Sequence, residues 1–175
     1  MNTDEIYYEF VKSLGKRYGD RWEYIKNDGA VRSELDYCMW KHNKGEFTEK
    51  EVEWAYTQLD RLSSVKLTPL DVKVGDGVTV NLWSDRHACT VTKVTKAFVV
   101  VQRDKATLDP EFKPEWILGG FAGHCVNQDE QSYTYERDEN GQTYKLYWSN
   151  RYSRYGQPGS PSLSKGRHEF YDYNF

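Results

Sequence analysis

Aromatic and cationic side chains alternate through residues 144–155, a pattern typical of surfaces that bind nucleotides or single-stranded nucleic acid. Bases stack on aromatic rings, and Lys or Arg neutralises phosphate. No Asp or Glu occurs from Gln142 to His168, whereas five Lys or Arg residues do. The candidate ligand-binding residues in this segment are Tyr147, Trp148, Arg151 and Arg154. An alternative interpretation is a strand whose aromatic residues are half core, followed by a loop that is basic by chance.

A second polar group combines residues 84–87 (SDRH) with residues 102–105 (QRDK). In the expected three-stranded meander both segments lie at the same end of the sheet, so their side chains meet there. Arg86, Arg103 and Lys105 are candidate phosphate ligands, because guanidinium and ammonium groups bind phosphate by charge-assisted hydrogen bonds. The alternative is that Arg beside Asp forms solvated ion pairs, which add little to stability.

Catalytic and metal-ligating patterns are weak. His124 and Cys125 are adjacent, and the side chains of adjacent residues usually point apart, so each needs a partner from elsewhere. Asp71-x-Lys73, with Asp60 upstream, resembles a metal-dependent nuclease pattern only loosely, and it falls in a connection between elements. Residues 119–123 (GGFAG) lack the Lys-Ser/Thr of a phosphate loop. The four histidines are not at zinc-ligand spacing, so no metal and no cofactor is expected.

Composition excludes several classes of protein. The formal charge of -3 and the mean hydropathy of -0.88 predict no global attraction to nucleic acid and no membrane association. Cys38, Cys89 and Cys125 are odd in number and far apart, which favours reduced thiols in a cytoplasm over disulfides or zinc. The 27 aromatic residues among 175 supply the burial that a globular fold needs. We therefore expect a soluble intracellular protein.

Helical patterns occupy residues 1–65, the expected helical domain. Thr3 would cap a first helix that Gly15 ends, and Thr48-x-x-Glu51 is a capping box at the start of the last. Short helices are expected at 22–25 and, capped by Ser33, at 35–40. These helices form a small bundle for protein binding or oligomerisation, since the acidic last helix would repel DNA phosphates.

Strand patterns occupy residues 66–175, the expected β-rich domain. Apolar residues alternate over 78–82, which predicts a strand. Further strands are expected at 87–95, 97–102 and 167–173. The strand at 97–102 is expected to be buried on both faces. Residues 108–127 are expected to be irregular. Asn140-Gly141 predicts a hairpin between 133–136 and 143–148. The predicted fold class is α+β: an N-terminal helical bundle followed by an antiparallel SH3-like β-barrel or half-barrel.

The strings SDRHA (84–88), QRDKA (102–106), GGFAGHCVNQDEQ (119–131) and KGRHEFYDYNF (165–175) resemble an uncharacterised family of accessory proteins of tailed phages and prophages. The resemblance covers residues 70–175. It implies a phage gene product in the host cytoplasm, of the kind that inhibits host defence, for example an anti-CRISPR protein or a sponge for nucleotide signals.

These observations predict a non-enzymatic protein that inhibits a host target, by occluding or capturing a nucleic-acid or nucleotide ligand. Its partner would be a host defence protein or that protein's ligand, and homo-oligomers are left open. Two alternatives remain at this stage. One is a small nuclease or nucleotide hydrolase, for which Asp104 or His124 would be essential. The other is a virion or assembly protein that forms stable oligomers without nucleotide affinity.

Overall fold

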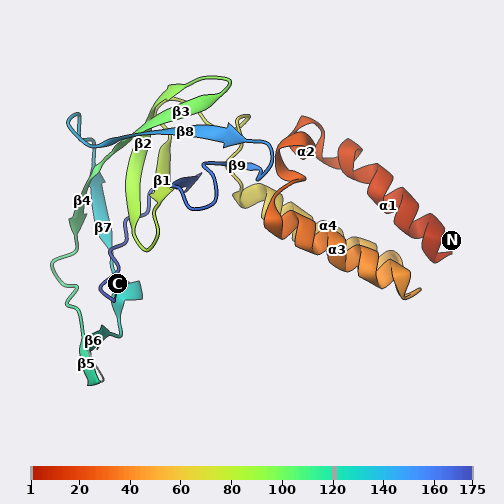
Figure 1. The fold of residues 1–175 in the computed structure, drawn as a ribbon, viewed down its shortest axis with the longest axis horizontal. Helices are drawn as coiled ribbons and strands as arrows, with labels where there is room; N and C mark the ends of the chain where they lie inside the picture. The colour runs from red at the N-terminus through yellow and green to blue at the C-terminus, as the bar shows by residue number, and fades with distance from the viewer. Residues whose placement is uncertain (1, 120–121, 175) are drawn as a thin grey trace. The chain divides into compact units, whose positions relative to one another are not determined.

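The computed structural model describes residues 2–119 and 122–174, and the chain divides into two compact units (Figure 1). A helical unit comprises Met1–Asp71 with Ser149–Arg154, and a sheet unit comprises Val72–Trp148 with Tyr155–Phe175. The division therefore lies six residues beyond the expected boundary at 65/66. Arg21 holds the connecting segment to the helices, because its Nη2 donates to the Lys66 carbonyl and its Nη1 to the Asp71 carboxylate, each at 2.8 Å.

Four α-helices form the first unit: α1 Thr3–Tyr18, α2 Asp20–Ile25, α3 Gly29–Asn43 and α4 Glu49–Val65. The capping box at Thr48 is present. The other ends differ from the prediction: Asn2 caps α1, Asp28 caps α3, and α1 continues past Gly15 to a residue of positive φ, Gly19. The side-chain oxygens of Asn2 and Asp28 accept from free N–H groups in the first turn of each helix. The predicted caps, Thr3 and Ser33, lie inside the helices, where they cannot do this.

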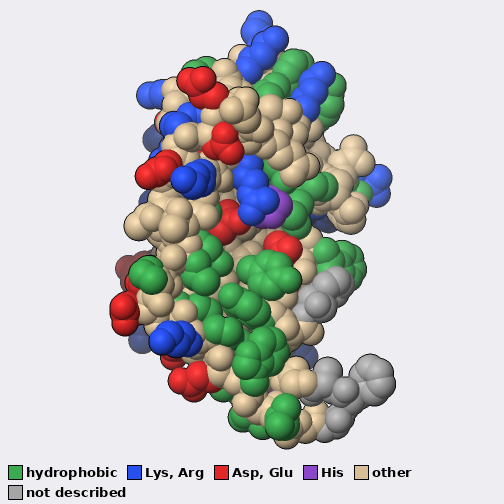
Figure 2. Space-filling model, turned by 90° about the vertical axis from the view of Figure 1, so that its left-hand side faces the viewer, with side chains coloured by type: hydrophobic (Ala, Val, Ile, Leu, Met, Phe, Trp, Pro, Cys, Tyr) green, Lys and Arg blue, Asp and Glu red, His purple; other side chains and the backbone are tan. Residues whose placement is uncertain are grey.

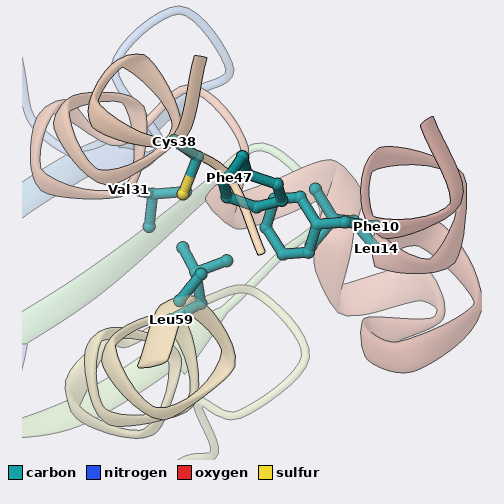
Figure 3. Packing of buried hydrophobic residues seen from close by; sticks show 7 residues of the cluster. Phe10, Leu14, Val31, Cys38, Phe47 and Leu59 are labelled. Atoms are coloured by element: carbon teal, nitrogen blue, oxygen red, sulfur yellow. The ribbon is translucent and has the colours of Figure 1, made fainter. Parts of the chain in front are cut away.

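Buried side chains from α1, α3 and α4, together with Phe47 of the loop between α3 and α4, form the core of the helical unit. Its members are Phe10, Leu14, Val31, Cys38, Phe47, Ala55 and Leu59. Figure 3 shows Phe47 between the side chains of α1 and those of α3, with Leu59 of α4 facing them. Burying a side chain of this size contributes about 1.5–3 kcal/mol, so this cluster stabilises the bundle.

The sheet unit contains a six-stranded sheet in the order β10-β1-β2-β3-β8-β9. Its strands are β1 Gly77–Asn81, β2 Arg86–Val94, β3 Phe98–Arg103, β8 Thr143–Ser149, β9 Arg154–Tyr155 and β10 Ser162–Lys165. The predicted meander β1-β2-β3 is present and antiparallel. The α+β class is confirmed, but β10 and β9 are the two edges of an open sheet, so the described strands form no closed barrel.

Three further predictions for the sheet are wrong in detail. The strands flanking Asn140-Gly141 do not pair with each other, since Tyr133–Glu136 pairs with β4 and β8 pairs with β3. The strand β3 alternates, with Val99 and Val101 buried and Val100 only partly so. Residues 167–173 form no continuous strand, because within the described part of the chain their backbone pairs with the sheet only at the isolated bridge between Arg86 and Phe170.

A long two-stranded arm extends from the sheet (Figure 1). It is built from nested antiparallel pairs, β4 Lys105–Leu108 with β7 Tyr133–Glu136 at its base and β5 Trp116–Gly119 with β6 Ala122–Cys125 at its end. A 3-10 turn, η1 Gln128–Glu130, lies between β6 and β7. Residues 108–127, expected to be irregular, thus contain two strands. Residues 166–174, which we call the C-terminal segment, bind both the sheet and this arm.

Candidate functional site

A pocket of about 300 Å³ opens beside β8, and we call it the β8 pocket. Its lining comes from β8 and from the loop between β9 and β10: Tyr144, Lys145, Leu146, Tyr147, Gly156, Gln157, Ser160 and Pro161. All of these residues belong to the sheet unit. Tyr147, which the sequence nominated, is 54 % exposed at this pocket, so its ring is available to a ligand. This volume is at the lower end of the range for small-molecule sites.

Lys145 supplies the positive charge of the β8 pocket. Its Nζ lies 4.1 Å from the ring centroid of Phe98 and 5.0 Å from that of Tyr147. These cation–π contacts hold the ammonium group against two rings at a partly exposed site. The pocket therefore combines an exposed aromatic ring with a cation that lies over it.

The loop that forms the other wall of the β8 pocket is tightly ordered. Gly156 has φ +90°, and a Cβ there would lie 2.0 Å from the Pro161 carbonyl oxygen, so only glycine fits. The Gly156 N–H donates to the Tyr147 carbonyl at 3.0 Å. Within the loop, Ser160 Oγ accepts from the Gln157 N–H at 2.8 Å. These bonds fix the loop to β8 and preserve the shape of the pocket.

Arg86 and Arg103 lie at the same end of the sheet, as the sequence predicts, and both bind the C-terminal segment. Arg103 Nη2 donates to the Glu169 carboxylate at 2.5 Å, and the other oxygen of Glu169 accepts from the Ala88 N–H at 2.7 Å. The Arg86 guanidinium lies 5.3 Å from the ring centroid of Phe170, with its Nη1 3.2 Å from His168 Nε2. The structure therefore engages both arginines in contacts that hold the chain's end.

Asp104 is the most buried carboxylate of the sheet unit's ion pairs, with its side chain 1 % exposed. Arg167 Nε donates to one of its oxygens at 2.7 Å and Arg137 Nη1 to the other at 3.2 Å. The Thr90 hydroxyl donates to the carboxylate and accepts from Arg167 Nη2 at 2.6 Å. Since every contact is to a group of the fold, Asp104 acts structurally here.

The other nominated cations have different surroundings. Lys105 is exposed and pairs with Glu136 across the arm at 3.7 Å. Arg151 and Arg154 belong to the helical unit, where Arg151 lies 5.4 Å from the centroid of Tyr152. The Nε of Arg154 is buried and has no hydrogen-bond partner among the residues that the structure describes.

Trp148 belongs to the sheet unit, and it packs edge-on against Tyr155 at 5.2 Å between ring centroids. It does not line the β8 pocket. Of the four residues nominated between 147 and 154, only Tyr147 lines that pocket.

Tyr144 connects the β8 pocket with the interior of the sheet unit. Its hydroxyl is 2.6 Å from His87 Nδ1 and donates to Gln142 Oε1 at 3.1 Å. Burial, and then the positive charge of Arg103, lowers the pKa of His87 below its usual value of 6.5. The imidazole is therefore neutral at pH 7, and it positions Tyr144.

The nominated catalytic groups have partners that suit structural roles. Cys125 is buried and its Sγ donates to Asn127 at 3.5 Å, whereas its neighbour His124 is exposed. Asp60 binds Arg17, and Asp71 binds Arg21. Across residues 2–119 and 122–174, no three His, Cys, Asp or Glu side chains are grouped so as to hold a metal ion.

One exposed feature escaped the sequence analysis. All four residues of β5 are exposed, and three of them, Trp116, Ile117 and Leu118, are apolar. The sequence contained a signal for this exposure, because three large apolar residues stand in a row between Glu115 and Gly119. In a strand, such a run places apolar side chains on both faces, and a two-stranded arm cannot cover both.

Comparison with family models, with curated proteins and with solved structures found no match. None of the helices in the described part of the chain is long and apolar enough to cross a membrane.

Proposed function

We propose that this protein is a non-enzymatic binding protein that captures a nucleotide, or one nucleotide of a single strand, in the β8 pocket. The observation that carries the proposal is the exposed ring of Tyr147 beside the Lys145 ammonium in a pocket of about 300 Å³. A base stacks on an aromatic face whatever its identity, and the adjacent cation attracts the phosphate. The order of the loop 156–161 supports a pocket that exists before the ligand binds.

The biological setting is a further part of the proposal. On the resemblance to phage accessory proteins, the captured ligand belongs to a host defence system in the host cytoplasm, and its removal inhibits that system. We also propose that β1-β2-β3 is the core of an SH3-like half-barrel. Its support is the antiparallel order of the three strands and the shift in register between Val91 and Lys93, since a bulge bends a strand.

The test is calorimetric titration of the full chain with uridine and adenosine monophosphates and with ten-residue strands of dT and U. Binding should weaken as salt increases, because each phosphate contact releases counterions. The Tyr147→Ala variant should lose about 1–3 kcal/mol of stacking, at least about fivefold in Kd. Lys145→Met should weaken binding and flatten its salt dependence.

Two controls make the test specific. Tyr171→Ala removes a tyrosine of nearly equal exposure, 56 %, from the C-terminal segment. Lys113→Met removes an exposed cation from the arm. Both variants should bind as the wild type does. Binding that is absent for every probe, or equal in Tyr147→Ala and Tyr171→Ala, would refute the proposal.

A further inference from the structure

The end of the arm exposes an apolar strand. Trp116, Ile117 and Leu118 of β5 are 49, 60 and 89 % exposed, and Val126 after β6 is 48 % exposed. Figure 2 shows the face on this side of the sheet unit, where hydrophobic side chains gather in the lower half, the part in which Figure 1 places the arm's end. Contiguous apolar side chains of this kind mark interaction sites on soluble proteins.

The fold holds this strand pair in place. Asn127 Oδ1 accepts from the Glu115 N–H at 2.8 Å and its Nδ2 donates to the Lys113 carbonyl at 3.0 Å. Asn174 of the C-terminal segment binds both backbone groups of Cys125, at 2.7 Å and 3.0 Å. An apolar strand that is braced from two directions presents its side chains at a fixed position, which lowers the entropic cost of binding.

Further ring contacts brace the same strand. The ring of Tyr173 lies edge-on to that of Trp116, with 6.1 Å between centroids, and edge-on to that of Tyr171, at 5.0 Å. The C-terminal segment therefore extends the aromatic surface along the arm.

The exposed charges around the strand are nearly all negative. Between residues 107 and 132 the exposed charged residues are Asp109, Glu111, Lys113, Glu115, Asp129 and Glu130. Five exposed carboxylates thus lie on the segments that flank the apolar strand along the chain, with a single Lys among them, and we call them the carboxylate rim. Such a rim attracts a positively charged partner and repels nucleic acid.

One edge of β5 also lacks a partner strand. The pair β5-β6 forms a two-stranded sheet of its own, so within the described residues the outer edge of β5 has no strand beside it. An unpaired edge is a template for strand addition, in which backbone hydrogen bonds provide affinity and side chains provide specificity.

From the exposed apolar strand, the carboxylate rim and the unpaired edge of β5, we propose that β5 docks an extended, Lys- or Arg-rich segment of a partner protein. The segment adds a strand to the outer edge of β5, and its apolar side chains pack beside Leu118, which shares one face of the strand with Trp116. Its cations meet the carboxylate rim. This surface lies on the arm and includes no residue of the β8 pocket. The inference therefore stands or fails independently of nucleotide binding.

A second copy of this chain is an alternative partner, because its residues 142–168 carry no Asp or Glu and would face the carboxylates of the first copy. That contact would join two unlike surfaces, and such heterologous contacts produce chains of molecules unless a rotation closes them into a ring. A separate partner protein needs no such closure. Self-association through β5 is accordingly an outcome that contradicts the proposal.

The experiment measures fluorescence anisotropy of three labelled eight-residue peptides against the full chain. One alternates Lys and Val, one alternates Glu and Val, and one is the Lys-Val peptide with an N-methyl group on every residue. The Lys-Val peptide should bind, and the other two should bind at least about tenfold more weakly, because one has the wrong charge and the other cannot donate backbone hydrogen bonds.

Variants locate the surface. Ile117→Ser with Leu118→Ser should weaken the Lys-Val peptide about tenfold or more, which is the scale for losing interface anchors. Glu111→Lys with Glu115→Lys should also weaken it. The control is Trp83→Ser, which removes a large side chain of 85 % exposure outside the arm and should change nothing.

Three results would overturn the proposal. The first is the absence of binding to the Lys-Val peptide. The second is an unchanged Kd in Ile117→Ser with Leu118→Ser. The third is a wild-type protein that elutes as an oligomer and becomes monomeric in that double variant, since a second copy would then be the occupant.

Discussion

Replacing Asp104 with Asn should weaken the attachment of the C-terminal segment to the sheet. The carboxylate has its two oxygens on different guanidinium groups, Arg167 at 2.7 Å and Arg137 at 3.2 Å. An amide of the same shape keeps one acceptor oxygen and turns an NH₂ group toward the other guanidinium, so donor faces donor.

The expected loss of unfolding free energy is about 2–3 kcal/mol. A hydrogen bond to a charged group contributes about 1.5–3 kcal/mol, and removing one partner of a buried ion pair costs about 3–5 kcal/mol. The value is reduced because the Arg167 and Arg137 side chains are 33 and 43 % exposed, so water replaces part of what they lose. In urea this corresponds to a midpoint lower by about 1 M or more.

The assay is urea unfolding followed by hydrogen exchange with mass spectrometry, which reports the two units separately. Faster exchange should appear first in residues 166–174 and in β2 and β3, with the helices α1 to α4 unchanged. The control Asp129→Asn alters an exposed carboxylate and should stay within about 0.5 kcal/mol of wild type. A loss below about 0.5 kcal/mol in Asp104→Asn, or equal loosening of the helices, would refute the reasoning.

Three further predictions concern single groups. Gly141→Ala should cost about 1–3 kcal/mol or more, because its Cβ would lie 2.0 Å from the Arg103 carbonyl oxygen. The lowered pKa of His87 means that the unfolded state binds more protons below pH 6.5, so unfolding free energy should fall as pH drops from 7.5 to 5, and less so in His87→Gln. Burial raises the pKa of Cys38 to about 11 and that of Cys89 to about 12, so neither should react with a thiol reagent at pH 8 until the chain unfolds.

Each of these predictions has an outcome that contradicts it. A Gly141→Ala variant as stable as Gly119→Ala, where a Cβ meets nothing within 4 Å, would contradict the close approach. Equal pH dependence in wild type and His87→Gln would show that another group titrates. Native-state labelling of Cys89 at the rate of an unfolded control would contradict its burial.

Local signals predicted the start of α4 and the meander well, whereas they misplaced the caps of α1 and α3. The Thr48-x-x-Glu51 box starts α4 as expected, and alternation located β1 and β2 to within a residue or two. In the sheet unit, the prediction that failed most clearly is one that a distant residue decides. Asn140-Gly141 looks like a hairpin turn, yet Gly141 is required by the approach of the Arg103 backbone. Strand pairing across the arm then overrides the local turn signal.

The candidate site was predicted in part. Tyr147 is exposed at a pocket, and Arg86 and Arg103 share one end of the sheet, as strand order required. The contacts that these two arginines make could not be predicted from sequence, because their partners, Glu169 and Phe170, lie more than 60 residues away along the chain. Arg151 and Arg154 follow Tyr147 closely in sequence but belong to the other unit.

The measurement that tests the central claim most directly is amide chemical-shift mapping of the full chain with uridine monophosphate. The account predicts the largest changes at Tyr144–Tyr147 and at Gly156, Gln157 and Ser160, on the two walls of the β8 pocket, and their loss in Tyr147→Ala. Shifts that centre instead on Arg86, Arg103 and the C-terminal segment, or no saturable shift at any residue, would contradict it.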